Sequence, residues 1–155
     1  MGSYKTKVFN ALIAGFASML TIGILAYLSS IHISIMLLVG SFGATLVLTY
    51  GFPDNPFAHP INIFFGHFIT AFPAVVITSI FSGPVYLLIA ISVGIGIFLM
   101  IALDVVHPPA GGNPIAVILS NHSYDFLLQS IIPGSLLIII LSYVINNFLL
   151  KRKYP

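Results

Sequence analysis

The chain has 155 residues, of which 59% are hydrophobic and only 5% are charged. Ordinary soluble domains carry roughly 25% charged residues, so this composition excludes a water-soluble globular protein and indicates one embedded in a lipid bilayer. There is no cysteine, which excludes disulfides and thiolate metal sites, and a net charge of +2 gives no reason to expect a nucleic-acid partner.

Charged residues are rare along the chain and mark off long apolar stretches. After Lys7 the next charged residue is Asp54, followed by Asp104, Asp125 and Lys151. A helical crossing needs about 20 apolar residues, so each of the first two intervals is long enough for two crossings and a turn. The sequence therefore predicts an all-α transmembrane bundle of five or six membrane segments, in one domain over residues 1–155.

Turn signals divide these intervals into separate spans. Ser29-Ser30 interrupts the first interval, Asp54-Asn55-Pro56 ends it, and Ser82-Gly83-Pro84 divides the second. Pro60 suits the first turn of a helix, because its missing N–H is not needed there. We therefore expect complete spans near residues 8–28, 31–51, 61–81, 85–104 and 126–149.

Residues 105–120 do not fit a continuous span. Pro108-Pro109 disfavours helical geometry and Gly111-Gly112 adds flexibility. Asn113-Pro114 then resembles a helix start, with the asparagine as N-cap, but a helix over 114–120 would be only about 10 Å long. Irregular backbone at membrane depth is tolerated only where it is buried in protein or lines a wet cavity. The sequence predicts a broken segment that either re-enters or crosses the membrane, with a surface loop as the alternative.

Basic residues lie only near the two ends of the chain, at positions 5, 7 and 151–153. The positive-inside tendency places both termini in the cytoplasm, which requires an even number of crossings. The broken segment would supply the sixth crossing, and a four-span arrangement also satisfies this parity. We expect an integral protein of a prokaryotic plasma membrane, which forms a homodimer or homotrimer if one chain is too small to enclose a pathway.

Three motifs resemble those of a known membrane-protein family. His107-Pro108-Pro109-Ala110-Gly111-Gly112-Asn113-Pro114 is similar to the signature of the HPP family of integral membrane proteins. Gly40-Ser41-Phe42-Gly43-Ala44-Thr45 matches a second family pattern, and Pro56-Phe57-Ala58-His59-Pro60-Ile61-Asn62 followed by Gly66-His67 resembles a third. The resemblance covers nearly the whole chain. It implies four transmembrane helices and a transport function, with nitrite transport as the activity associated with plastid members.

The chain departs from the family pattern at two places. Many members have Gln-Pro-Arg-Asn where this chain has His59-Pro60-Ile61-Asn62, so one candidate anion contact is absent. Gly112-Asn113 stands where Ala-Thr is commoner. The resemblance implies a transporter or channel for a small monovalent inorganic anion, with nitrite as the first candidate, and implies no cofactor, metal or enzymatic reaction.

Neutral groups would have to bind such an anion, because no Lys or Arg occurs between Lys7 and Lys151. A half-helix that begins at Asn113 would offer backbone amides in the manner of helix N-terminal anion sites. The expected substrate-binding residues are drawn from all three motifs: His107, Pro108, Pro109, Gly111, Gly112, Asn113, Ser41, Gly43, Thr45, Asn62 and His67.

Two histidines and one acid are candidates for proton coupling. His67 lies within a predicted span and His107 opens the octet, and either imidazole can carry a proton near neutral pH or remain a neutral hydrogen-bonding group. Asp104 either pairs with His107 or is an interfacial carboxylate. The alternative functions that use these three residues are a proton or cation pathway and a membrane-embedded enzyme. The remaining histidines, at positions 32, 59 and 122, are expected at the membrane interface.

An internal repeat is a further possibility. Residues 41–46 can be laid over residues 109–114 at an offset of 68, which would give two halves of three elements, inverted relative to each other. Other repeated dipeptides do not share this offset. His-Pro at 59 and 107 gives an offset of 48, and Asn-Pro at 55 and 113 gives an offset of 58.

Overall fold

A computed structural model describes residues 4–31 and 37–155, and in these ranges every regular element is a helix, with no strand. Four of the described helical stretches are long and apolar enough to cross a membrane. They are α1 (Tyr4–Ile31), α3 (Pro60–Ile80), α4 (Val85–Ala102) and a last stretch composed of α6 (Tyr124–Phe126), the π-helical η4 (Leu127–Ile131), α7 (Ile132–Val144) and the π-helical η5 (Ile145–Leu149). The predicted all-α polytopic bundle is confirmed.

Two further elements are only half as long as a crossing. The first is α2 (Gly40–Leu46), which continues as the π-helical η1 (Val47–Gly51). The second is the 3-10 helix η3 (Pro108–Gly112), which leads into α5 (Asn113–Leu119). At about 1.5 Å per residue, each is far shorter than the roughly 30 Å hydrocarbon core.

The first half-helix differs from the complete span expected near 31–51. Residue 31 ends α1, residues 32–36 lie outside the described ranges, and Val39 is still extended, with φ −120° and ψ 134°. The prediction of a complete span was wrong because this region is uniformly hydrophobic. Hydrophobicity alone does not distinguish an apolar extended segment from an apolar helix.

Helix starts follow the local signals of the sequence. α3 begins at Pro60, and the His59 ring accepts a hydrogen bond from the Ile61 N–H at 3.3 Å. A short 3-10 helix, η2 (Pro56–Ala58), precedes it and is capped by Asn55, whose Oδ1 accepts from the Phe57 N–H at 2.8 Å. These caps fix the turn that carries the chain from the first half-helix into α3.

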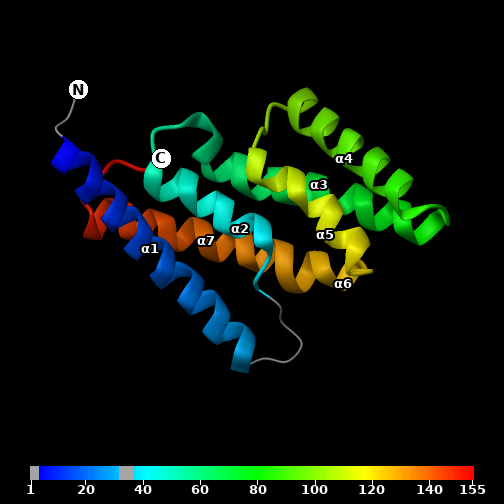
Figure 1. The fold of residues 1–155 in the computed structure, drawn as a ribbon, viewed down its shortest axis with the longest axis horizontal. Helices are drawn as coiled ribbons and strands as arrows, with labels where there is room; N and C mark the ends of the chain where they lie inside the picture. Colours follow the sequence, from blue (N-terminus) through cyan, green and yellow to red (C-terminus); the bar gives the residue numbers. More distant parts are fainter. Residues whose placement is uncertain (1–3, 32–36) are drawn as a thin grey trace.

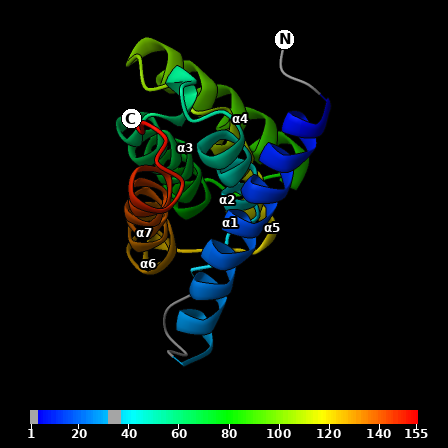
Figure 2. The ribbon, with the colours of Figure 1, turned by 90° about the vertical axis from the view of Figure 1, so that its left-hand side faces the viewer.

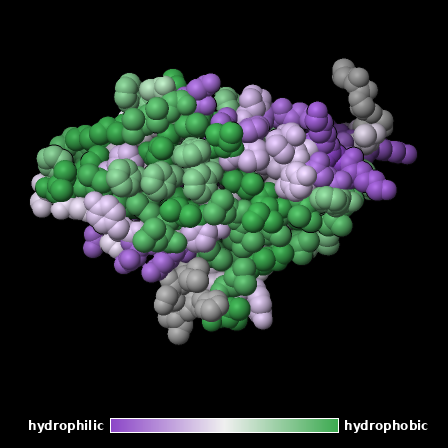
Figure 3. All heavy atoms as spheres, turned by 180° about the vertical axis from the view of Figure 1, so that it is seen from behind, coloured by the Kyte–Doolittle hydropathy of each residue, from purple (hydrophilic) through white to green (hydrophobic). Residues whose placement is uncertain are grey.

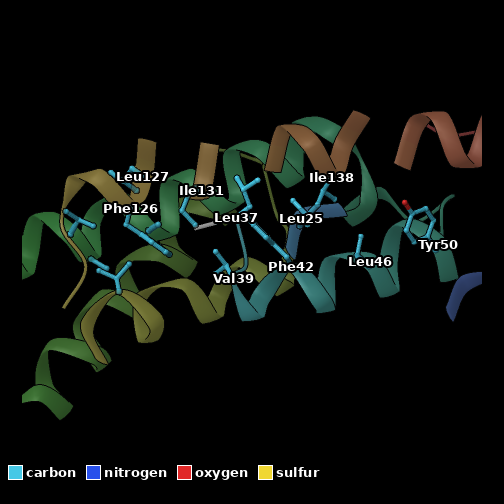
Figure 4. Packing of buried hydrophobic residues seen from close by; sticks show 14 of the residues in the cluster. Leu25, Leu37, Val39, Phe42, Leu46, Tyr50, Phe126, Leu127, Ile131 and Ile138 are labelled. Carbon is cyan, nitrogen blue, oxygen red and sulfur yellow. The ribbon is translucent and has the colours of Figure 1, made fainter. Parts of the chain in front are cut away.

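The two half-helices run in opposite directions from starts that lie next to each other (Figure 1). The long helices surround them, and α1 lies at the edge of the bundle, with its second half extending beyond the other helices (Figure 2). The core lies between α2 and the last helical stretch, where side chains of Leu37, Phe42, Ile131 and Ile138 pack together (Figure 4).

The order of elements repeats as long helix, half-helix, long helix. The first half-helix covers residues 40–51 and the second, with η3, covers residues 108–119, an offset of 68. The same offset relates buried positions of α3 to buried positions of the last stretch: Ile63 to Ile131, Gly66 to Gly134, Ala74 to Ser142 and Ile77 to Ile145. The structure thus supports the offset of 68 over the alternatives of 48 and 58.

Hydrophobic side chains dominate the outer surface, where the bilayer would lie. Phe9, Phe16, Met19, Ile97 and Phe98 are all exposed on α1 and α4. Figure 3 shows this broad hydrophobic surface, with hydrophilic residues gathered mostly at the end that carries the N-terminus. Exposed apolar surface on this scale is stable only in lipid, so the protein is an integral membrane protein.

Candidate functional site

The two half-helices are joined at their starts by a direct hydrogen bond. Ser41 is the second residue of α2 and Asn113 the first residue of α5, and the Ser41 hydroxyl donates to Asn113 Oδ1 at 2.7 Å. Asn113 is fully buried and Ser41 is half-buried. This contact brings two residues that are 72 positions apart in the sequence into one polar cluster.

Two buried histidines complete this cluster. Thr45, one turn after Ser41, has its Oγ1 2.9 Å from Nε2 of His67 and 2.8 Å from Nε2 of His107. The two imidazole rings have centroids 5.0 Å apart, and all three side chains are 0% exposed. A single hydroxyl therefore bridges α3 and the broken segment in the interior of the bundle.

The surroundings of His107 fix which of its ring nitrogens carries a proton. Nδ1 lies 2.7 Å from the backbone carbonyl of Phe57, which can only accept. His107 must therefore donate through Nδ1–H, and in the neutral ring Nε2 is left as an acceptor. It follows that the Thr45 hydroxyl donates to His107.

His67 has the opposite tautomer, and Asn113 is the reason. The Asn113 amide nitrogen lies 3.1 Å from the His67 carbonyl, which fixes the orientation of the amide because its oxygen would repel that carbonyl. The same nitrogen lies 3.0 Å from His67 Nδ1, so Nδ1 accepts and Nε2–H donates to Thr45.

These constraints define a directional chain of donors. It runs from the Asn113 amide to His67, from His67 to the Thr45 hydroxyl, from that hydroxyl to His107, and from His107 to the Phe57 carbonyl. With both imidazoles neutral, each of their nitrogens has a partner. A fully satisfied network is what makes burial of so many polar groups tolerable.

Sequence reasoning missed two members of this network. Thr70 lies one turn after His67, is fully buried, and its Oγ1 accepts from the Asn113 amide at 3.1 Å. Its spacing of three residues from His67 on one helix was a usable signal. The Phe57 carbonyl carried no such signal, because any residue offers the same backbone acceptor.

The close approach of the broken segment to α3 depends on a missing side chain. A Cβ on Gly66 would lie 2.6 Å from the His107 Cβ and 3.3 Å from the Val105 carbonyl. Val105 and its neighbours are irregular, as predicted, and η3 then forms a single 3-10 turn. Gly66 therefore allows His107 to reach Thr45.

A family model described as the transmembrane region of HPP matches residues 3–155. The chain belongs to the HPP family. A transmembrane protein of Dictyostelium discoideum is 29% identical over 150 residues, which cover 92% of this chain and 53% of that protein. A second from the same organism is 27% identical over 150 residues, covering 92% and 48%. The chain spans about half the length of these curated relatives, and no solved structure matches it.

The HPP octet contributes unequally to the cluster. His107 and Asn113 are its two buried polar members, whereas Pro108 and Gly112 are exposed and Pro109 and Gly111 are half-buried. Asn113 is not the N-cap that the sequence suggested. It has helical φ −60° and ψ −43°, and its amide binds the cluster instead of the helix start.

Three other expected site residues lie away from the histidines. Asn62 is half-buried and donates to the Pro56 carbonyl at 3.0 Å. Gly43 faces open space on α2, with nothing within 4 Å of an added Cβ. Asp104 is exposed at the end of α4 with φ 55°, and it forms no hydrogen bond with His107. His59 and His122 lie at turns, and His32 is outside the described residues.

A separate cavity of about 690 Å³ lies between α1 and the end of the first half-helix. Its lining includes Lys7, Asn10, Tyr50 and Arg152, and it does not include the histidine pair. Within the described ranges, no group of three histidine or acidic side chains gathers as metal ligands would.

Proposed function

We propose that this HPP protein is a transporter or channel for a small monovalent inorganic anion, with nitrite as the first substrate to test. The observation that supports it is the buried cluster of His67, Thr45, His107 and Asn113 where the two half-helices begin. Broken helices that meet at mid-membrane, in units repeated with opposite orientation, are the construction used by many secondary transporters.

The charge of the cluster favours an anion over a metal cation. No acidic side chain contributes to it, and Asp104, which a cation pathway would need, is exposed and forms no hydrogen bond with His107. The cluster consists of hydroxyl, amide and imidazole groups, which can donate hydrogen bonds to an anion without holding it as tightly as Lys or Arg would. Such weak binding permits release on the far side.

The site is closed in this conformation. Thr45, His67, His107 and Asn113 are all 0% exposed, so an anion reaches them only after the surrounding helices move. Ser41 is the half-buried member of the cluster, and the neighbouring Gly40 and Gly43 are exposed with no atom near an added Cβ. We therefore propose that an anion approaches the cluster along this glycine face of α2.

The test is anion uptake by proteoliposomes that contain the purified protein. Nitrite, nitrate and chloride are compared with potassium, for the wild type, for His107→Gln and for His122→Gln. His122 is partly exposed and its ring stacks on Phe126 and not on a residue of the cluster, so it is a matched control. We expect His107→Gln to lower nitrite uptake at least tenfold and His122→Gln to leave it unchanged. Wild-type uptake no faster than that of protein-free liposomes for every anion contradicts the proposal.

A further inference from the structure

We propose that the cluster takes up one proton, on Nε2 of His107, and that rotation of the Thr45 hydroxyl makes room for it. The choice of His107 over His67 follows from hydrogen-bond geometry alone. The role of this protonation, the uptake of one proton with each anion, rests on the proposed transport function. The ligand assigned to this new site is thus a proton, delivered together with the substrate.

His67 is closed to a second proton. Its Nε2 already carries hydrogen, and its Nδ1 faces the Asn113 amide nitrogen at 3.0 Å, which is a donor. Turning the amide over would place its oxygen against the His67 carbonyl, 3.1 Å away, and would lose the bond from Ser41. A proton on His67 therefore needs two unfavourable changes at once.

His107 is open to a proton because its Nε2 lone pair accepts from a hydroxyl that can turn. Thr45 Oγ1 has a second acceptor within reach, the Ser41 carbonyl at 3.2 Å. When a proton binds Nε2, the bond from Thr45 to His107 breaks. The Thr45 hydrogen then points to the Ser41 carbonyl, and Oγ1 accepts from both His67 Nε2–H and His107 Nε2–H. Every donor keeps an acceptor, so the protonated network is as complete as the neutral one.

The resulting positive charge has no acidic partner in the cluster. The titratable groups on the elements around His107 are His67 on α3, His59 at the start of α3, Tyr86 on α4 and Asp104 after α4. The last three are exposed. A buried charge without a counter-ion is strongly unfavourable, whereas a proton and a monovalent anion entering together leave the site neutral. One proton per anion is the stoichiometry that this arrangement favours.

Nitrogen NMR of the histidine rings tests the assignment without any transport assay. Protein labelled with ¹⁵N-histidine is titrated with acid in lipid nanodiscs, and His67→Gln and His107→Gln identify the resonances. We expect Nε2–H for His67 and Nδ1–H for His107 at high pH, with His107 alone of this pair gaining a proton. Protonation of His67 first, or the same tautomer for both rings, overturns the proposal.

Two substitutions of Thr45 separate the hydroxyl's role from simple packing. Thr45→Val preserves shape but removes the acceptor for protonated His107, so the proton affinity of His107 should fall at least about tenfold, the size expected for one hydrogen bond to a charged group. Thr45→Ser retains the hydroxyl and should restore wild-type affinity. Equal proton affinities in the Val and Ser variants contradict the rotation.

Flux measurements then test whether proton entry is coupled to anion uptake. Their outcomes distinguish a failure of this coupling from a failure of the proposed transport function. Proteoliposomes with an internal pH dye should show about one proton entering per nitrite, and Thr45→Val should weaken this coupling more than Thr45→Ser. Nitrite uptake without proton entry overturns the coupling while the proposed function stands. If NMR shows the predicted tautomers but no anion is taken up, the proton site is supported and the proposed function is overturned.

Discussion

Gly66 contacts His107 so closely that even a methyl group on the glycine would overlap the histidine Cβ, with only 2.6 Å between the two atoms. Both atoms are attached directly to the backbone, so no side-chain rotation relieves the overlap. Position 66 therefore sets the distance between α3 and the broken segment, and through it the distance from His107 to Thr45.

The first prediction is that Gly66→Ala destabilises the protein by about 1–3 kcal/mol, the usual range for overpacking a well-packed interior. Gly43→Ala is the matched control, because an added Cβ there meets nothing within 4 Å. It should be neutral or stabilising by up to about 1 kcal/mol, as alanine favours helix over glycine. Thermal unfolding in detergent, followed by circular dichroism, measures both. Equal melting temperatures for the two variants would show that the close approach is not needed.

The second prediction uses the corresponding glycine of the repeat. A Cβ on Gly134 would lie 3.4 Å from the Leu37 carbonyl and would overlap the ring of Phe42. Leu37 and Val105 are themselves 68 residues apart, so each glycine meets the irregular backbone before the other unit's half-helix. Gly134→Ala should therefore also destabilise the protein by about 1–3 kcal/mol. The proton affinity of His107 in Gly134→Ala should be closer to the wild-type value than the proton affinity of His107 in Gly66→Ala. The reason is that Gly134 contacts Phe42 and not the histidine.

Much of the fold could be predicted from the sequence because its signals are strong and local. The ends of α3 and α4 follow from Pro60, Ser82-Gly83-Pro84 and Asp104, and the irregular backbone before the octet follows from its prolines. The half-helical nature of residues 40–51 could not be recognised. No proline or charge marks its start, and only the offset of 68 from the octet hinted at it.

The site was predicted in part for a different reason. The sequence points to His67 because ionisable groups are unfavourable in lipid, and to His107 and Thr45 through the motifs that resemble the HPP family. The structure brings all three side chains together. The N-cap role of Asn113 was wrong, because capping is a local rule and the amide is drawn to His67 instead. Asn62 belongs to a matching motif, and only the tertiary structure shows that its amide binds the Pro56 carbonyl and not the cluster.

The third prediction concerns orientation. The chain has no cysteine, so single cysteines can be introduced at exposed positions and labelled with a membrane-impermeant maleimide. Lys5→Cys and Lys153→Cys should react only from the cytoplasmic side, and Ser82→Cys and Ser120→Cys only from the opposite side, because α3 and α5 end away from the termini (Figure 1). Labelling of positions 5 and 153 from different sides would require an odd number of crossings.

The fourth prediction concerns stability at alkaline pH. Tyr154 is buried and its hydroxyl donates to the Ala58 carbonyl at 2.8 Å. Burial, and to a lesser degree the nearby Tyr50, raises the pKa of Tyr154 above its usual value of about 10. The unfolded chain therefore loses this proton first, so the free energy of unfolding falls as pH rises above about 10. Tyr154→Phe should reduce that fall, whereas Tyr86→Phe, an exposed control, should not. Melting curves between pH 8 and 11 measure the difference, and identical pH profiles for both variants would contradict it.

The last prediction moves the proton from one histidine to the other. Asn113→Asp replaces the amide nitrogen, which now faces His67 Nδ1 at 3.0 Å and the His67 carbonyl at 3.1 Å, with a carboxylate oxygen. The oxygen still accepts from Ser41, but it repels the carbonyl and attracts a hydrogen on Nδ1. His67 should therefore become the protonated ring, paired with the new carboxylate, and its ¹⁵N signals should show hydrogen on both nitrogens at neutral pH. Because the new negative charge already neutralises that proton, anion uptake should fall at least tenfold. A variant in which His107 remains the first ring to be protonated would show that Asn113 does not control the site.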